Sequence, residues 1–147
     1  MDPRRMHSLG LIIDHLVDAL GEPSCPVRRA AVLNDLWAHP GSSLNDVMER
    51  LSLDKSTAFR DIDWLVDHGC VVKKTNPEDA REVSLQVFGH ARAHLEAALQ
   101  LAGTSDKLAS FLNNMMSLST DRKQTLREAK ILISLTNHGE MDKNSLT

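Results

Sequence analysis

The stretch that decides the fold runs from residue 42 to residue 85 and reads SSLNDVMERLSLDKSTAFRDIDWLVDHGCVVKKTNPEDAREVSL. Its first part places apolar residues at i, i+3, i+4 and i+7, the spacing of one helix face. These residues are Leu44, Val47, Met48 and Leu51. A second stretch with helical spacing follows, with Asp54 as its N-cap and Gly69 as the residue that ends it. The segment therefore predicts two helices joined by a tight turn.

The second of these helices is predicted to have two different faces. Its apolar stripe consists of Ala58, Ile62, Leu65 and Val66. A rotation of 100° per residue places Ser56, Thr57, Arg60 and Asp63 on the opposite face. A short helix that supports a second helix with a polar and basic first turn is the helix-turn-helix arrangement that fits the DNA major groove. Phe59 falls between the two faces, and we assign it to the core, with contact to a thymine methyl group as the alternative.

Two short runs of strand-forming residues follow the second helix. Residues 70–74 and 82–86 can pair as a hairpin. The intervening loop, residues 76–80, contains Asn, Pro and Asp, which favour turns. Helices followed by such a hairpin form a winged helix. The predicted fold class is therefore mainly α, an α+β winged helix-turn-helix.

The same stretch resembles the winged-helix core of the MarR family, whose members are dimeric bacterial transcription regulators. The most specific part of the resemblance is the hairpin, where Asp79-Ala80-Arg81 matches the family's Asp-x-Arg. Ser56-Thr57, Leu65, Gly69 and Pro77 also match. One departure is that the helix and hairpin carry more acidic residues than a strong DNA binder of this family would.

The resemblance and the helix pattern together nominate residues for DNA contact. These residues are Lys55, Ser56, Thr57, Arg60, Lys73, Lys74, Asp79 and Arg81. An arginine can donate two hydrogen bonds to a guanine edge, and Ser or Thr can reach bases or phosphates. We expect Arg60 to read a base, Lys73 and Lys74 to contact phosphates, and Asp79 to hold Arg81 by a charge-assisted hydrogen bond. The alternative for the helix residues is an ordinary solvated face.

The 147 residues, of which 41% are hydrophobic, predict one domain with an aliphatic core. We expect a winged helix-turn-helix lobe over residues 26–87, a helical region over residues 6–21 and 88–136, and a flexible tail over residues 137–147. Within residues 88–136 we expect one long helix that is kinked or broken at Gly103, and then a last helix capped near Asp121.

Both ends of the chain carry more apolar helix face than one small lobe could cover. The residues that we expect to make a dimer interface are Leu9, Ile12, Ile13, Leu16, Leu126, Leu132 and Leu135. The family resemblance implies that the first and last helices interlock with those of a second copy. The sequence therefore predicts a homodimer.

Net charge gives no support for nucleic-acid binding, because it is −3 at pH 7. From Ser52 to Arg81 the chain has five basic and six acidic residues. Phosphate contacts supply most non-specific DNA affinity, so this balance argues against an indiscriminate binder but not against a specific one. Arg28 and Arg29, at the start of the helix after Pro26, are interpreted as solvated helix charges, with phosphate contact as the alternative.

The histidines and cysteines offer two candidate sensor sites. His90 and His94 stand at i, i+4 on one helix face and could bind a metal, with His15, Cys25 and His39 nearby, but no further ligand motif appears and solvated histidines are the preferred interpretation. Cys25 is a redox candidate because neighbouring arginines could lower its thiol pKa. An inert thiol is the default, and Cys70 is interpreted as a small core residue.

Other classes of protein find little support in the sequence. We find no glycine-rich phosphate loop, nucleophile elbow or paired-carboxylate motif, so no enzyme and no cofactor is predicted. No apolar run approaches the ~20 residues of a membrane span. The start of the chain lacks a secretion signal, and two widely separated cysteines fit reduced thiols, so a cytoplasmic, nucleoid-associated protein is expected.

The prediction is a sequence-specific DNA-binding transcriptional regulator. The expected partners are double-stranded DNA with a pseudo-palindromic operator and a second copy of the chain. Repressor action relieved by a small-molecule effector or another signal follows from the family resemblance. The alternative is a winged-helix protein–protein adaptor that does not bind DNA, which the acidic local charge favours.

Overall fold

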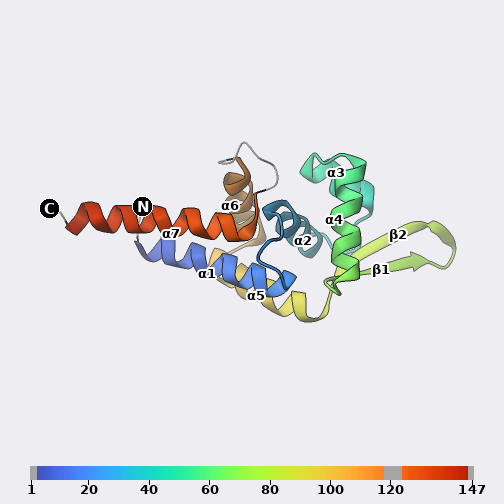
Figure 1. The fold of residues 1–147 in the computed structure, drawn as a ribbon. Coiled ribbons are helices and arrows are strands. Elements are labelled where there is room, and N and C mark those ends of the chain that lie inside the picture. The colour runs from blue at the N-terminus through green and yellow to red at the C-terminus, as the bar shows by residue number, and fades with distance from the viewer. Residues whose placement is uncertain (1–2, 118–123, 146–147) are drawn as a thin grey trace.

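The computed structural model describes residues 3–117 and 124–145, and it leaves undescribed the side chains of residues 3, 5, 6, 80–82 and 136–145. The described elements follow one another as helices, a hairpin and helices (Figure 1). They are α1 (Pro3–Leu20), α2 (Val27–Ala38), α3 (Leu44–Leu51), α4 (Lys55–Asp67), β1 (Val71–Asn76), β2 (Asp79–Val87), α5 (Gly89–Ala102), α6 (Ser105–Ser117) and α7 (Leu126–Ser145). The mainly α winged-helix fold class is confirmed.

Local capping interactions define the two helices of the helix-turn-helix. Ser43 and Asp46 form a capping box at the start of α3, because each side chain accepts a hydrogen bond from the backbone N–H of the other residue. Asp54 caps α4 by accepting from the backbone N–H of Thr57 at 2.8 Å, as the sequence predicted. Ser52, between the helices, has φ +53°, a left-handed conformation that ends α3.

The hairpin has a tighter turn than the sequence predicted. Asn76 pairs with Asp79, so only Pro77 and Glu78 connect the strands. The Asn76 side chain accepts a hydrogen bond from the backbone N–H of Glu78 at 3.0 Å, a local contact that stabilises the turn. The strands therefore extend further toward the tip than residues 74 and 82.

A short backbone pairing ties the hairpin to the segment before α3. The N–H of Leu85 donates to the carbonyl of Ser42 at 2.9 Å, and the N–H of Gly41 donates to the carbonyl of Leu85 at 2.9 Å. Because this segment leads directly into α3, the pairing fixes the hairpin relative to both helices of the helix-turn-helix.

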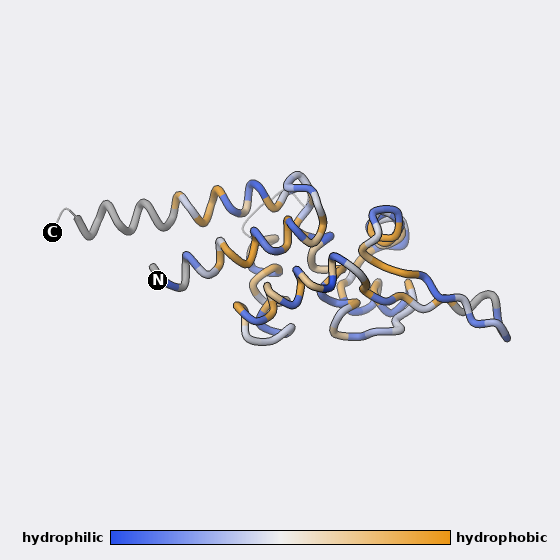
Figure 2. The backbone as a smooth tube through the Cα atoms, turned by 90° about the horizontal axis from the view of Figure 1, so that it is seen from below, coloured by the Kyte–Doolittle hydropathy of each residue, from blue (hydrophilic) through white to orange (hydrophobic). Residues whose placement is uncertain are grey.

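Helix α1 packs mainly on α5 and also on α7. Figure 1 shows α1 and α7 running side by side away from the winged lobe. Apolar positions recur along the tube of α1 (Figure 2). Helix α1 thus finds its partners within the chain, although the sequence indicated none in the winged lobe.

The residues expected at a dimer interface fall into two groups. Ile12, Ile13, Leu16 and Leu126 are at most 2% exposed, and Leu9 packs against the same core. These side chains pack into the core of the single chain, and their assignment to a dimer interface stays a prediction. Leu132 and Leu135 are 42% and 63% exposed, so they lie on the protein surface.

The break at Gly103 separates two helices with different partners. Gly103 has φ +102°, which disfavours residues with a side chain, and α6 begins two residues later. Helix α6 packs on α2, whereas α5 packs on α1. Of the two expected outcomes at Gly103, a kink or a break, the structure shows the break.

Helix α7 extends to Ser145, beyond residue 136 where the helical region was expected to end. Its first turn is capped by Thr125, whose hydroxyl accepts from the backbone N–H of Glu128 at 3.2 Å. The cap expected near Asp121 lies outside the described residues. No helix in the described part of the chain is long and apolar enough to cross a membrane.

Candidate nucleic-acid interface

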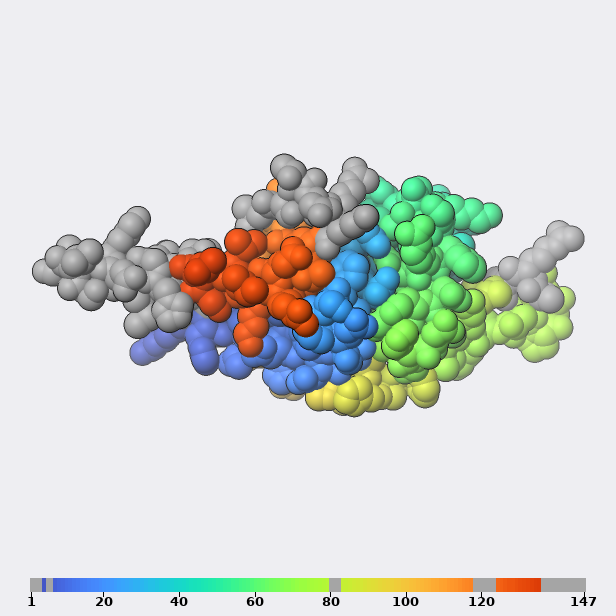
Figure 3. All heavy atoms as spheres, in the orientation of Figure 1, coloured from blue at the N-terminus to red at the C-terminus, as the bar shows by residue number. Residues whose placement is uncertain are grey.

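The polar face of α4 points away from the protein core. Lys55, Ser56, Arg60 and Asp63 are exposed and Thr57 is half-buried, whereas Ala58, Ile62 and Leu65 on the opposite face are at most 4% exposed. The division of α4 into an apolar and a polar face is therefore confirmed. In the space-filling view the green surface of α3 and α4 adjoins the protruding hairpin (Figure 3).

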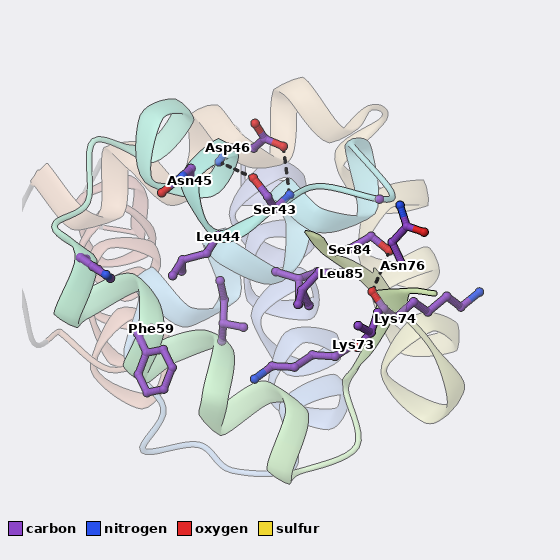
Figure 4. A pocket seen from close by; sticks show the side chains of 15 residues that line it. Ser43, Leu44, Asn45, Asp46, Phe59, Lys73, Lys74, Asn76, Ser84 and Leu85 are labelled. Carbon is purple, nitrogen blue, oxygen red and sulfur yellow. Dashed lines mark hydrogen bonds between the residues drawn. The ribbon is translucent and has the colours of Figure 1, made fainter. Parts of the chain in front are cut away.

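A groove of about 830 Å³ separates the helix-turn-helix from the hairpin. Its walls come from the start of α3, from α4 and from both strands (Figure 4). Lys55 of α4 and Lys73 and Lys74 of β1 line it, so three of the predicted DNA contacts meet there. Asn45 and Asn76 also line the groove. Local sequence patterns do not indicate them, because the pairing of Ser42 with Leu85, which joins distant segments, places the start of α3 beside the hairpin.

The two lysines of β1 point in different directions. Lys73 runs toward α4 and its Nζ lies 6.0 Å from the centre of the Phe59 ring, whereas Lys74 points away from α4 (Figure 4). Neighbouring residues of a strand alternate between its two faces, which explains the difference. Both side chains are exposed, and Lys73 is the one that lies beside α4.

The assignment of Phe59 to the core is wrong. Its side chain is 54% exposed and lines the groove. At its place in α4 the buried stripe is already filled by Ala58 and Ile62, so the ring turns outward to the lysine of the hairpin. An exposed aromatic ring at this position offers an apolar contact of the kind that thymine methyl groups accept.

Asp46, the acidic residue of the groove, caps the start of α3. Asp46 accepts hydrogen bonds from the backbone N–H of Ser43 at 2.9 Å, and this lowers the pKa of its carboxyl group. The carboxylate thus stays charged while it caps α3. Three lysines oppose this one carboxylate among the groove residues, so the groove is locally basic.

The inner face of α4 carries a buried ionic brace. Asp61 is 0% exposed and accepts hydrogen bonds from Arg28 at 2.6 and 3.1 Å and from Arg29 at 3.3 Å. Arg29 also stacks on the ring of Trp64, at 4.5 Å. The hydrogen bond to Asp61 raises the pKa of the Arg28 guanidinium. The interpretation of Arg28 and Arg29 as solvated charges is wrong, because both bind α4 to α2.

The brace changes the charge balance that the sequence suggested. Asp61 is one of the six acidic residues between Ser52 and Arg81, but its charge is buried and matched by two arginines from outside that segment. The exposed charges of the segment are therefore less acidic than the sequence count. The charge argument for an adaptor that does not bind DNA loses most of its force.

The tip of the hairpin holds the remaining predicted contacts. Asp79 is exposed at the start of β2, and Arg81 lies two residues further along the same strand. The side chain of Arg81 is outside the described residues. The expected hydrogen bond between Asp79 and Arg81 therefore stays a prediction.

The two cysteines are buried and unpaired. Cys25 is 1% exposed, and burial raises the pKa of its thiol even though Arg29 lies 3.8 Å from the sulfur. The alternative of a lowered pKa is contradicted, because desolvation outweighs the nearby guanidinium, and the default interpretation of an inert thiol fits the burial. Burial likewise raises the pKa of Cys70 to about 11, which fits its interpretation as a core residue.

The histidine pair lies at the start of α5, next to the last turns of α1. The rings of His90 and His94 are 4.4 Å apart, and the Nε2 of His90 donates to the backbone carbonyl of Asp18 at 2.9 Å. The metal-ligating groups that gather here among the described residues are His15, Asp18 and His94. His90, Cys25 and His39 do not belong to that group.

Comparison with known proteins finds similarity in the winged lobe and in the overall fold. Residues 27–83 match the family model described as MarR family. The apo form of wild-type MarR from E. coli superposes with a TM-score of 0.50 and 21% identity, over 76% of this chain and 91% of that chain. It shows that the two proteins share a fold. No relative was found among curated proteins.

Two further solved structures are similar. MarR from Listeria monocytogenes has a TM-score of 0.48 and 21% identity, over 90% of this chain and 83% of that chain. A variant of E. coli MarR crystallised with operator DNA has a TM-score of 0.49 and 21% identity, over 76% of this chain and 88% of that chain.

Proposed function

We propose that the chain is a sequence-specific DNA-binding transcriptional regulator of the MarR family, on the premise that its residues 27–83 match that family's model. The observation that carries the proposal is the exposed polar face of α4 beside a lysine-lined groove and a protruding hairpin. This arrangement lets a helix enter the major groove while the hairpin follows the adjacent backbone. Such a protein would act in the bacterial cytoplasm, where the chromosome is.

Different residues would have different tasks in the complex. Arg60 is exposed one turn into α4, where its guanidinium can reach a base edge, with Ser56 and Thr57 beside it. Lys55, Lys73 and Lys74 would contact phosphates, which fix the position of the protein but carry no sequence information. Arg81, steadied by Asp79, would reach the minor groove or its phosphates. The exposed Phe59 adds an apolar contact to the same face.

We further propose that the regulator is a homodimer that binds a pseudo-palindromic operator. Ile131 and Leu135 on α7 are 52% and 63% exposed, and Leu11 on α1 is 36% exposed. A second copy would cover these apolar side chains, together with Leu132. Two-fold symmetry would then set the two α4 helices on half-sites about 34–36 Å apart. A monomeric mass by light scattering at micromolar concentration would contradict the dimer.

The remaining part of the proposal is that the protein acts as a repressor and that an effector releases it from DNA. A cavity of about 380 Å³ lies between α1 and α7, and one of about 350 Å³ lies between the turn after α3 and the end of α6. Both volumes fall in the range of small-molecule sites, about 300–1,000 Å³. A small molecule that binds either cavity could alter the placement of the winged lobe.

An electrophoretic shift with fragmented genomic DNA, repeated at several salt concentrations, tests the proposed function. We expect a subset of fragments to stay bound at salt concentrations that release the others. Salt weakens the phosphate contacts that all fragments share, whereas base-specific contacts add affinity for the selected fragments alone. Arg81→Ala should weaken binding of the selected fragment with the fold intact. If no fragment is retained at any salt concentration, the adaptor function takes the place of the regulator.

A further inference from the structure

A cluster of metal-ligating side chains joins α1 to α5, outside the proposed DNA interface. His15 and Asp18 stand at i, i+3 on α1 and therefore share one face of that helix. His94 comes from α5, the helix on which α1 packs most extensively. One ligand atom from each of the three residues lies within 4.8 Å of those of the other two.

From this geometry we propose that His15, Asp18 and His94 bind a divalent transition-metal ion, with Zn²⁺ as the best match. Two imidazole nitrogens and one carboxylate suit Zn²⁺ and leave a fourth position for water. Ligand bonds of about 2.0–2.2 Å put tetrahedral ligand atoms roughly 3.4 Å apart. Because the ligand atoms lie within 4.8 Å of one another, each pair would have to approach by no more than about 1.4 Å to reach this spacing.

The surroundings of the cluster also favour a bound ion. The Nδ1 atom of His15 is buried and has no hydrogen-bond partner in the described part of the chain. A buried polar atom without a partner carries a free-energy cost, and a metal ion or a water in its shell would supply the missing partner. His15 and His94 are half-buried and Asp18 is exposed, so the cluster lies at the solvent-facing edge of the contact between α1 and α5.

His90 has a supporting role at this site. Its Nε2–H donates to the carbonyl of Asp18, and its ring meets that of His94 edge to face at 4.4 Å. These contacts hold the residue that carries the carboxylate and the ring of the second imidazole in place. Groups that orient metal ligands in this way usually contribute 10- to 100-fold to affinity. A metal ion here would link α1 to the first turns of α5, which directly follow the hairpin.

The test uses the full chain after treatment with a chelator and titrates it with Zn²⁺ alone by calorimetry. We expect one Zn²⁺ per chain at micromolar affinity or tighter, and a rise in the unfolding temperature when Zn²⁺ is present. His15→Asn and His94→Asn should each weaken binding by more than about 100-fold, since loss of a ligand costs more than loss of a supporting group. Asp18→Asn, at an exposed position, should weaken binding without affecting folding.

His7→Asn is the matched control, because His7 is an exposed histidine on the same helix two turns before His15. It should leave Zn²⁺ affinity unchanged. Titration with Co²⁺ supplies an independent readout, since coordination by these ligands gives visible absorption bands that His94→Asn should remove. The proposal is overturned if the parent chain binds no Zn²⁺. It is equally overturned if His15→Asn, Asp18→Asn and His94→Asn all bind Zn²⁺ as tightly as the parent chain.

Discussion

Arg60 and Asp61 are neighbours in α4, yet they belong to two different regions of the molecule. Arg60 is exposed on the outer face, beside the groove and the hairpin. Asp61 is fully buried on the inner face, where Arg28 and Arg29 hold it. One face of the helix is therefore available to a ligand while the other stabilises the lobe.

The difference shows why charges in a sequence cannot simply be added to judge DNA binding. A buried carboxylate paired with two arginines contributes almost nothing to the potential at the outer face, because the opposite charges lie within hydrogen-bond distance of it. The exposed Asp63, two residues further on, does contribute. The inner and outer faces should accordingly respond to mutation in different ways, one in stability and the other in DNA binding.

The largest effect is expected on the inner face. Asp61→Ala leaves two mostly buried guanidinium groups without their counter-charge, and removal of one partner of a buried ion pair typically costs about 3–5 kcal/mol. The free energy of unfolding, measured in urea at a fixed protein concentration, should fall by about this amount. The free energy of unfolding of Asp61→Asn should lie between that of Asp61→Ala and that of the parent chain, because the amide oxygen still accepts a hydrogen bond.

Asp63→Ala is the control for this prediction, since it removes the same type of side chain from the outer face of the same helix. Exposed substitutions usually change stability by no more than about 0.5 kcal/mol. We expect Asp63→Ala to leave the urea midpoint unchanged and to raise DNA affinity modestly. If Asp61→Ala and Asp63→Ala unfold at the same urea concentration, the two faces do not differ in the way described.

The second largest effect is expected on DNA binding, for a substitution on the outer face of α4. Arg60→Ala should leave stability unchanged and reduce the difference in affinity between operator and random DNA. A bidentate arginine–guanine pair discriminates between bases by about 1–3 kcal/mol. The measurement is the affinity for operator and scrambled duplexes at several salt concentrations. Arg92→Ala, which removes an exposed arginine from α5, should leave both affinities unchanged. An equal loss on both duplexes would make Arg60 only another phosphate contact.

Much of the fold could be predicted because its signals are local. Helix faces follow from the spacing of apolar residues, and Asp54 and Gly69 act within a few residues of the ends that they define. The two faces of α4 were predicted in the same way. Phe59 was assigned wrongly because it lies at the border of the stripe, where the angle alone does not decide between core and surface.

The contacts that could not be predicted join residues that are distant in the sequence. Arg28 and Asp61 are separated by 33 positions, and no sequence pattern indicates that their helices meet there. The same holds for His94 and the pair His15 and Asp18, which meet only because α1 packs on α5. Cys25 is a related case. Its neighbouring arginines are visible in the sequence, but the burial that determines its pKa is not.

The smallest effects are expected for the two lysines of β1, and they test how the outer face meets DNA. Each phosphate contact contributes to the salt dependence, so loss of one lysine should reduce the slope of log affinity against log salt by about one unit. Each of the variants Lys73→Ala and Lys74→Ala should weaken binding of operator DNA and of random DNA by the same factor, because phosphates carry no sequence information. Lys107→Ala on α6 is the control and should leave the slope unchanged.

The two lysines should differ if the groove between α4 and the hairpin faces the DNA. Lys73 points toward α4 and lies 6.0 Å from the ring of Phe59, whereas Lys74 points away. Lys73 would reach a phosphate held beside α4, so we expect Lys73→Ala to lose more DNA affinity than Lys74→Ala. Phe59→Ala should then lower DNA affinity by a larger factor in the parent chain than in the Lys73→Ala variant, because the two side chains support the same contact with DNA. If Lys74→Ala has the larger effect, the DNA backbone follows the other side of the hairpin and the groove is not part of the interface.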